Sequence, residues 1–472
     1  MKWIAEACGA EIIGGAAGAE VNSVCIDSRA AKAGDLFFAI KGEKFDGHDF
    51  IHEVEAKGVV AVVVEKKRLP VKSPSCAMLA VRDVRVAFGE VAAACRRQFD
   101  LPVIAVGGSN GKTTVKELIA SVLRQKFSTL WSEASFNNDI GVPLTLLRLK
   151  KSHQAAVLEA GTNHPGELAP LVKMIAPKLG VITTIGREHL EFFGDVAGVA
   201  QEEGWLAELL PADGKLFLNG DNEWSKQIAA RAKAQVVSVG LGEKNDWCAK
   251  KIRLDKSGVT FSVAALCERR GGDEEARRSQ TAATATFCGE YRINLLGRHQ
   301  VTNALFAIAL GAELGLDRAE IQDGLVACPP PKMRLNFWEA NGVRVLDDSY
   351  NANADSTIAA LETLCGLPLQ GRRVAVLGDM AELGAHSAAA HAEVGRRAAE
   401  LKLGQLFAIG KMAVVTGKAA RDAGLMRVFE FVEVEAALNV VKGFLKPGDV
   451  VLLKASRVSR LERIAEMLKA EK

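Results

Sequence analysis

The sequence has 472 residues, of which 49% are hydrophobic and 25% charged, with a formal net charge of +3 at pH 7. This length allows roughly two to four domains, each with its own core. The small net charge gives no electrostatic argument for a nucleic acid or a membrane surface as partner. No run of about 18 apolar residues predicts a membrane span, and Glu6 and Glu11 interrupt the apolar region that a signal peptide requires. We therefore expect a cytoplasmic protein without membrane insertion or nucleic-acid binding.

Residues 1–99 alternate short apolar runs with helical stretches, which predicts a small α/β domain. Within this segment, Ser28 and Arg29 follow the end of an apolar strand, and glycines nearby allow a ligand to approach closely. An arginine and a serine at a strand end can hold a phosphorylated ligand, but ordinary turn chemistry explains the same residues. Periodicity alone leaves both interpretations open.

The second segment, residues 100–328, opens with a phosphate-binding loop. An apolar run at 103–106 is typical of a buried parallel strand, a glycine-rich turn follows, and apolar residues recur at helical spacing from Lys112 onward. The glycines let backbone N–H groups turn towards an anion, Lys112 can reach the β- and γ-phosphates, and the Thr113 hydroxyl suits Mg²⁺. Val106 replaces the first glycine of the strict pattern, so the loop is a variant. The residues predicted to hold ATP are Gly108, Ser109, Asn110, Gly111, Lys112, Thr113 and Thr114.

Further apolar runs of this segment, at 155–159, 181–185 and 216–219, end in polar residues. Parallel strands joined by helices bind ligands at their carboxyl ends, so Glu159 and the region around His189 are expected near the phosphate loop. Taken alone, Glu159 is equally a metal ligand or a structural carboxylate, and a single His189 is more often structural. Their shared position after strands favours metal binding for both.

Two other features of the second segment carry expectations. Residues 268–280 are dense in both charges and predict a solvated loop. A helix is predicted over 302–315, and Asn303 in its first turn either hydrogen-bonds a base edge or caps the helix.

Three consecutive prolines at 329–331 form the clearest linker, because prolines continue neither a helix nor a sheet interior. Beyond it, in residues 329–472, apolar runs at 343–346, 374–377, 405–409 and 450–453 alternate with helical stretches and predict another parallel α/β sheet. No GxGxxG motif is present, so we do not expect a second nucleotide site there.

Assembled, these motifs resemble those of the Mur ligase family over all three segments. The loop GSNGKTT and the stretch NNDIGVP at 137–143 are similar to the central-domain motifs of the family. The stretches DDSYNAN at 347–353 and LGDMAELG at 377–384 resemble the members that add D-alanyl-D-alanine, and not those that add L-alanine, D-glutamate or the third residue.

The resemblance implies an α/β fold of three domains: a small N-terminal UDP-binding domain, a central P-loop ATPase-like parallel sheet and a C-terminal Rossmann-like domain. It also implies an ATP- and Mg²⁺-dependent ligase that joins D-alanyl-D-alanine to UDP-N-acetylmuramoyl-tripeptide through an acyl phosphate, in peptidoglycan precursor synthesis. A monomer is expected. We expect the proline linker to be the hinge of a domain closure that keeps water from the acyl phosphate.

Residue roles follow from the resemblance, position by position. Lys112 and Arg334 contact the ATP phosphates, Thr113 and Glu159 coordinate one Mg²⁺, and His189 coordinates a second. His299 and Asn303 match the nucleotide-binding segment, and Asp348 matches the ribose ligand. The residues implied in binding the UDP-substrate and the dipeptide are Ser28, Arg29, Asn137, Asn138, Tyr350, Asn351, Asn353, Lys454, Ser456 and Arg457.

Glu203 is the main departure from the family pattern. The family usually has a lysine there, which CO₂ converts to a carbamate that supports the second Mg²⁺. We expect the Glu203 carboxylate to supply that negative charge natively, directly or through water, and therefore count it with Lys112, His189 and Arg334 as catalytic. Two smaller departures are Gln300 for asparagine and Ala455 for glycine.

Two alternatives stay open. One is another ATP-dependent amide ligase, such as the third-residue ligase or a folylpolyglutamate synthase, which the stretch at 348–353 argues against. The other is a non-catalytic nucleotide-binding relative, supported only by the missing lysine at Glu203; a binding module would not need both metal sites. The sequence decides neither between diaminopimelate and lysine in the tripeptide nor between a dipeptide and a depsipeptide as second substrate.

Overall fold

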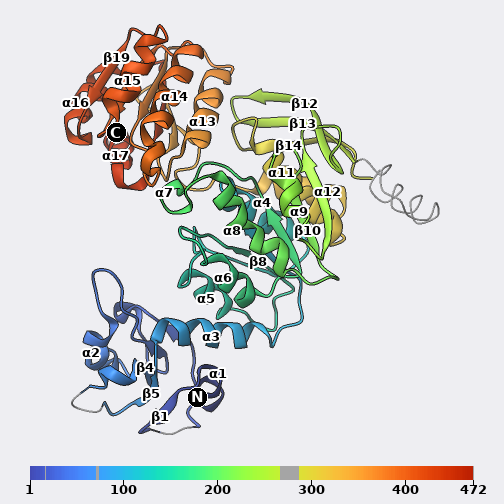
Figure 1. The fold of residues 1–472 in the computed structure, drawn as a ribbon, viewed down its shortest axis with the longest axis vertical. Helices are drawn as coiled ribbons and strands as arrows, with labels where there is room; N and C mark the ends of the chain where they lie inside the picture. Colours follow the sequence, from blue (N-terminus) through green and yellow to red (C-terminus); the bar gives the residue numbers. More distant parts are fainter. Residues whose placement is uncertain (16–17, 71–73, 266–285, 471–472) are drawn as a thin grey trace.

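The computed structural model describes residues 1–15, 18–70, 74–265 and 286–470. Three β-sheets organise the chain, and we call the parts that carry them the N-terminal, central and C-terminal domains. The N-terminal and C-terminal domains lie at opposite ends of the long axis of the molecule (Figure 1). The loop expected over 268–280 falls outside the described residues. Among the described helices, none is long and apolar enough to cross a membrane.

The N-terminal domain has a five-stranded sheet in the order β1-β5-β4-β3-β2, parallel except for the β1–β5 pair. Its strands and helices are β1 (Glu11–Ile13), β2 (Val24–Cys25), β3 (Leu36–Phe38), β4 (Ala61–Glu65), β5 (Ala77–Val81), α1 (Lys2–Cys8), α2 (Ile51–Ala56) and α3 (Val84–Arg96). At the end of α3, the buried Arg96 donates from Nε to the carbonyl of Ile175, 2.9 Å away. This bond ties the N-terminal domain to the central domain.

The central sheet has nine strands in the order β14-β13-β12-β11-β10-β9-β6-β8-β7. It is parallel from β7 to β12, and β13 and β14 add an antiparallel edge that the sequence did not predict. The strands are β6 (Val103–Gly107), β7 (Thr129–Trp131), β8 (Ala155–Glu159), β9 (Leu179–Ile182), β10 (Lys215–Asn219), β11 (Gln235–Gly240), β12 (Trp247–Asp255), β13 (Gly258–Ala265) and β14 (Gly289–Ile293).

Helices cover both faces of the central sheet. Helices α4, α11 and α12 pack on one face, and α6 and α8 on the other. The helices of this domain are α4 (Lys112–Leu123), α5 (Gly141–Leu146), α6 (Leu168–Ile175), α7 (Leu190–Phe193), α8 (Val196–Leu209), α9 (Ser225–Ala229), α11 (Gln300–Glu313) and α12 (Arg318–Ala327). The helix predicted over 302–315 is therefore α11, which begins and ends two residues earlier.

The strand predicted at 181–185 was wrong in its bounds, because β9 ends at Ile182. The next residues leave the sheet to contact the phosphate loop: the Ser109 amide donates to the Thr184 carbonyl (2.7 Å), and the Gly186 amide to Ser109 Oγ (2.9 Å). Hydrogen bonds to the phosphate loop replace strand pairing here. The apolar pattern of residues 181–185 does not distinguish the two, so it did not predict where β9 ends.

The C-terminal sheet has six strands in the order β15-β16-β20-β17-β18-β19, parallel except for the β15–β16 pair. The four predicted strands are present, and β15 and β19 were missed. The elements are β15 (Asn336–Ala340), β16 (Val343–Asp348), β17 (Arg373–Leu377), β18 (Gln405–Ile409), β19 (Val428–Phe431), β20 (Val450–Lys454), α13 (Ala354–Gly366), α14 (Ser387–Glu400), α15 (Ala413–Asp422), α16 (Val434–Phe444) and α17 (Glu462–Lys469). The last strand in sequence, β20, lies between β16 and β17, so the carboxyl ends of distant segments meet.

Candidate active site

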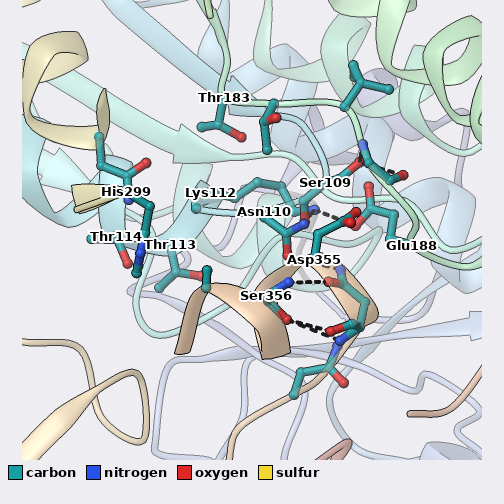
Figure 2. Close-up of a pocket in the computed structure, with 18 of the residues that line it drawn as sticks. Ser109, Asn110, Lys112, Thr113, Thr114, Thr183, Glu188, His299, Asp355 and Ser356 are labelled. Atoms are coloured by element: carbon teal, nitrogen blue, oxygen red, sulfur yellow. Dashed lines mark hydrogen bonds and ion pairs between the residues drawn. The ribbon is translucent and has the colours of Figure 1, made fainter. Parts of the chain in front are cut away.

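A cavity of about 890 Å³ lies between the central and C-terminal domains. It is lined by the phosphate loop, the segment after β9, the start of α11, and the residues that join β16 to α13. In Figure 2 the loop residues Ser109 and Asn110 lie beside Asp355 and Ser356 of α13. The carboxyl ends of β6, β8 and β16 all face this cavity, which is where parallel sheets place ligands.

The predicted strand, loop and helix are present at 103–123. Gly108 and Gly111 adopt left-handed backbone conformations, with φ of 106° and 91°. A Cβ on Gly108 would come within 2.5 Å of Thr183 Oγ1, and one on Gly111 within 2.8 Å of Asn303 Oδ1. Both positions therefore require glycine. Lys112 and Thr113 begin α4, and their side chains line the cavity.

Three buried carboxylates surround the Lys112 ammonium. Burial alone would lower the pKa of Lys112, but the charges of Glu188, Glu203 and Glu159 outweigh it and raise this pKa, so the lysine stays a cation. Its Nζ lies 3.2 Å from Glu188 Oε2 and also donates to two loop carbonyls. Each carboxylate keeps one oxygen for which the described residues offer no hydrogen-bond partner: Glu159 Oε2, Glu188 Oε1 and Glu203 Oε1.

Unpaired buried carboxylate oxygens are the ligand chemistry that a divalent cation needs. At the end of β8, Glu159 is 1% exposed, and its Oε1 accepts from Asn137 Nδ2 at 2.9 Å. Its free Oε2 and the Thr113 hydroxyl are hard oxygen donors and fit Mg²⁺. The described residues hold no group of three or more acidic, histidine or cysteine side chains that could bind a metal by themselves. The residues therefore fit a cation that takes its other ligands from phosphate and water.

A buried lysine outside the cavity fixes the loop that carries Asn137. Lys116 in α4 is fully buried, and its Nζ donates to the carbonyls of Ser132 (2.7 Å) and Ala134 (2.9 Å). The same loop presents Ser135, whose Oγ lies 3.5 Å from Thr113 Oγ1. Lys116 thus holds this loop against the helix that begins with the phosphate-binding lysine.

Glu203 lies beneath the phosphate loop and does not line the cavity. Its Oε2 accepts the Gly108 amide at 2.6 Å, and the side chain is fully buried in α8. Burial raises the pKa of Glu203 to about 8, with Lys112 opposing the shift and Glu188 adding to it. Glu203 therefore contacts the backbone of the phosphate loop, and the expected support of a cation by Glu203 stays a prediction.

His189 lies at the domain boundary, on the turn before α7. Its Nδ1 lies 2.6 Å from Glu382 Oε2 in the C-terminal domain, and its Nε2 lies 4.0 Å from Glu188 Oε2. The hydrogen bond from His189 lowers the pKa of Glu382. Sequence reasoning named neither acid as a site residue, although Glu188 directly precedes His189 and Glu382 belongs to the LGDMAELG stretch.

Arg334 reaches from the proline linker towards the central domain. Its guanidinium lies over the ring of Tyr350, 4.3 Å from the centroid, and its Nη2 lies 3.4 Å from Ser135 Oγ. The neighbouring residues Met333 and Leu335 have φ of 58° and 50°, a costly conformation that points Arg334 into the cavity. The family resemblance implies the same orientation, and the contact of Arg334 with phosphate stays a prediction.

Lys454 lines the cavity, and its ammonium pairs there with an acid of the neighbouring strand. Its Nζ is buried and lies 2.6 Å from Asp348 Oδ2 and 3.0 Å from the Asn351 carbonyl. The register of β16 with β20 sets Asp348 directly beside Lys454. The Lys454 ammonium is thus the counterion of Asp348, the predicted ribose ligand, and its expected contact with the dipeptide stays a prediction. Asp348 Oδ1 accepts the Leu335 amide.

The start of α11 contributes amide and imidazole groups to the cavity. Asn303 Nδ2 donates to Gln300 Oε1 at 2.8 Å, so Gln300 orients the predicted base-binding amide. Burial, with the nearby Lys454 charge, lowers the pKa of His299 to about 4, and the ring is neutral at physiological pH. A neutral imidazole offers both a donor and an acceptor to a ligand.

Direct contacts join the two domains across the cavity. Asn353 caps α13 by accepting from Ser356 N (2.9 Å), and its Nδ2 donates to Asn110 Oδ1 of the phosphate loop (3.0 Å). Arg187, after β9, binds both carboxylate oxygens of Asp355 and also pairs with Glu393 of α14. The C-terminal domain is therefore docked on the phosphate loop.

The structure leaves five predicted substrate-binding residues outside the cavity lining: Ser28, Arg29, Asn138, Ser456 and Arg457. Arg29 is exposed and pairs with Asp27 (2.7 Å), and Asn138 Oδ1 accepts the Gly141 amide (2.9 Å). Ser456 Oγ is buried and joins two backbone segments, while Arg457 pairs with Glu462 (3.2 Å). The side chains of Arg29, Asn138, Ser456 and Arg457 thus have partners in the protein itself. The binding roles of all five residues stay predictions.

A phosphate loop with buried carboxylates, facing a second α/β domain across a cavity, defines an ATP-using enzyme of several domains. Three segments match domain families: residues 20–98 the Mur ligase family catalytic domain, 106–311 the Mur ligase middle domain and 333–457 the glutamate ligase domain of Mur ligases. The chain belongs to the Mur ligase family.

Relatives agree over nearly the whole chain. The UDP-N-acetylmuramoyl-tripeptide–D-alanyl-D-alanine ligase of Escherichia coli K12 is 35% identical over 457 residues, which cover 95% of this chain and 94% of the relative. The Bacillus subtilis ligase of the same name is 32% identical over 450 residues, with coverage of 95% and 93%. Crystal structure I of MurF from Acinetobacter baumannii superposes with a TM-score of 0.86 at 31% identity, covering 99% and 98%. The family resemblance and the three-domain α/β fold predicted from sequence are confirmed.

Proposed function

We propose that the protein is the ATP-dependent ligase that joins D-alanyl-D-alanine to UDP-N-acetylmuramoyl-tripeptide. The names of relatives that match along 92–97% of their own length support these substrates. The observation that carries the proposal is the set of groups around Lys112, a cation on a phosphate loop that faces a docked second domain. Two acids that line the cavity with it, Glu159 and Glu188, each keep a free carboxylate oxygen.

The expected location and assembly are part of the proposal. The proposal keeps the expected monomer. The net charge of +3 gives no reason to invoke a nucleic acid. We infer a cytoplasmic enzyme because both proposed substrates are charged, water-soluble molecules.

The proposed reaction overcomes the low reactivity of a carboxylate towards an amine. The terminal carboxylate of the tripeptide takes the γ-phosphoryl group of ATP and becomes an acyl phosphate. The amine of D-alanyl-D-alanine then attacks the acyl carbon, and phosphate leaves. The first step brings two anions together. The second builds negative charge on the acyl oxygen and on the leaving phosphate, so catalysis depends on positioning and on fixed positive charge.

Lys112 and Arg334 supply that charge from two domains. Lys112 begins α4 at the phosphate loop, and Arg334 enters from the linker with its position fixed by Tyr350. Thr113 and Glu159 would hold one Mg²⁺ and His189 a second. Bound Mg²⁺ would neutralise phosphate charge and polarise the transferred group. Asn303 and Asp348 would contact the adenine and the ribose, and docking of the C-terminal domain would exclude water from the acyl phosphate.

Phosphate release from ATP tests the function. With UDP-N-acetylmuramoyl-tripeptide, we expect release that requires D-alanyl-D-alanine, together with a nucleotide-linked product heavier by one dipeptide. Lys112→Met, which removes the phosphate-binding charge, is expected to abolish both signals. Release that depends on a single amino acid in place of the dipeptide, or binding of ATP without any product, would overturn the proposal.

A further inference from the structure

His189 and Glu382 form a short contact across the domain boundary. His189 Nδ1 lies 2.6 Å from Glu382 Oε2, and the Glu191 amide donates to the Glu382 carbonyl at 3.0 Å. The histidine belongs to the central domain and the glutamate to the C-terminal domain. The contact can exist only while the two domains are docked.

Both residues have backbone conformations that are costly for side-chain-bearing residues. The φ angles are 48° for His189 and 60° for Glu382, both in the left-handed region. Such conformations are unfavourable and persist where the surroundings enforce them. Two strained residues that meet each other at a site boundary indicate that their relative position matters.

The hydrogen bond determines which ring nitrogen of His189 is free. A carboxylate only accepts, so Nδ1 must donate to Glu382. In the neutral ring that can bind a cation, Nε2 then carries the lone pair. Nε2 faces the side of the cavity where Glu188 lies, 4.0 Å from Glu188 Oε2. Glu188 Oε1 is one of the three carboxylate oxygens without a hydrogen-bond partner among the described residues. His189 Nε2 therefore lies near a carboxylate that gives one oxygen to Lys112 and keeps the other free.

We propose that Glu382 is a positioning residue, which fixes His189 as the Nδ1–H tautomer with Nε2 directed at a divalent cation that Glu188 also faces. Docking of the C-terminal domain then completes the cation site. This inference rests on the proposed function and deepens it. A carboxylate behind a metal-binding imidazole orients the ring and raises its basicity, and removing such a partner typically costs about 10–100-fold in metal affinity or activity.

Mn²⁺ binding to the full-length protein, measured by electron paramagnetic resonance with a non-hydrolysable ATP analogue and the UDP-tripeptide, tests the inference. The variant Glu382→Gly removes the carboxylate, and glycine adopts a positive φ without strain. We expect Mn²⁺ affinity to fall about 10–100-fold, and the Mg²⁺ concentration for half-maximal ligation to rise in parallel. Glu382→Gln, whose amide oxygen can still accept from Nδ1, should recover most of the affinity.

Glu400→Gln is the matched control. Glu400 carries the same charge in the C-terminal domain, but it pairs with Arg397 of the same helix and not with the central domain. We expect this variant to bind Mn²⁺ as the wild type does. Wild-type affinity in Glu382→Gly, or an equal loss in Glu382→Gly and Glu400→Gln, would overturn the inference. Failure of the wild type to ligate would instead overturn the proposed function, so the two failures are distinguishable.

Discussion

Lys112 Nζ lies 3.2 Å from Glu188 Oε2 at the edge of the cavity, with both side chains largely buried. Lys112, the proposed phosphate-binding lysine, thus forms an ion pair with an acid of its own domain. A phosphate group that reaches Lys112 must approach this carboxylate as well. The affinity of the site for ATP therefore depends on the charge that the acids present.

Glu188→Gln should tighten ATP binding in the absence of Mg²⁺ by several-fold, because one negative charge near the phosphates is removed. With Mg²⁺ present, the same change should lower the ligation rate, since the carboxylate that lies near His189 and keeps one free oxygen loses its charge. Calorimetric titration with and without Mg²⁺ measures the first effect. Glu191→Gln, a change two residues beyond His189 that leaves the Lys112 pair intact, is the control; equal ATP affinity for Glu188→Gln and wild type without Mg²⁺ would contradict this reasoning.

Glu203 should make stability depend on pH. Its pKa rises from 4.5 to about 8 in the fold, first because burial disfavours the charged form. The folded state therefore binds more protons than the unfolded state between these values. The contribution to stability is complete below about pH 4 and is lost as the pH rises through 8.

Glu203→Gln should remove that slope, because glutamine accepts the Gly108 amide without titrating. The free energy of unfolding of the wild type should fall relative to Glu203→Gln as the pH rises from 5 to 8. Chemical denaturation at a series of pH values measures the difference. Glu208→Gln, on the same helix but paired with Arg231 near the surface, should keep the wild-type slope; parallel curves for wild type and Glu203→Gln would refute the argument.

Activity should not depend on CO₂. Glu203 carries its own carboxylate, and a cation bound nearby would favour its ionised form despite the raised pKa of the cation-free protein. Degassed, bicarbonate-free buffer should therefore leave the ligation rate unchanged. A rate that falls on degassing and returns with bicarbonate would show that a lysine elsewhere in the chain is modified, and Glu203 would lose its expected role.

Arg187 should control the docking of the C-terminal domain. Its guanidinium binds Asp355 and Glu393, and Arg187→Ala removes both ion pairs. All three side chains are about one third exposed, so we expect a loss of only about 1–2 kcal/mol of docking free energy after solvent screening. Small-angle scattering should show a larger radius of gyration for Arg187→Ala, and compaction when the ATP analogue and UDP-substrate bind.

The control for docking is Arg85→Ala. Arg85 pairs with Asp139 between the N-terminal and central domains, and both side chains are about half exposed. This variant should leave the contact of the central and C-terminal domains intact. If Arg187→Ala scatters as the wild type does, with and without ligands, then the contacts of Arg187 do not hold the domains and the proline linker is not shown to be a hinge.

The parts of the site that the sequence predicted are formed by residues close together in the chain. The phosphate loop follows from a buried strand, two glycines with positive φ and an amphipathic helix, all within residues 103–123. Glu159 ends its strand as expected, since an apolar run that stops at a carboxylate marks the edge of a parallel sheet. Arg334, three residues past the last proline of the linker, was assigned by the family resemblance, and it lines the cavity.

Non-local pairing explains what the sequence did not reveal. Lys454 meets Asp348 only because β20 inserts between β16 and β17, and strand order is not encoded in periodicity. Glu382 meets His189 only because two domains dock. Glu203 accepts the Gly108 amide because the packing of α8 sets it under the phosphate loop, and its expected support of a cation stays a prediction.

The most direct test of the central claim follows oxygen through the reaction. The terminal carboxylate of UDP-N-acetylmuramoyl-tripeptide is labelled with ¹⁸O, and the protein is supplied with ATP, Mg²⁺ and D-alanyl-D-alanine. Ligation through an acyl phosphate predicts a product heavier by one dipeptide and inorganic phosphate that carries one ¹⁸O atom from the carboxylate. Product formed with unlabelled phosphate would contradict the acyl phosphate, and unlabelled phosphate without product would contradict the ligase.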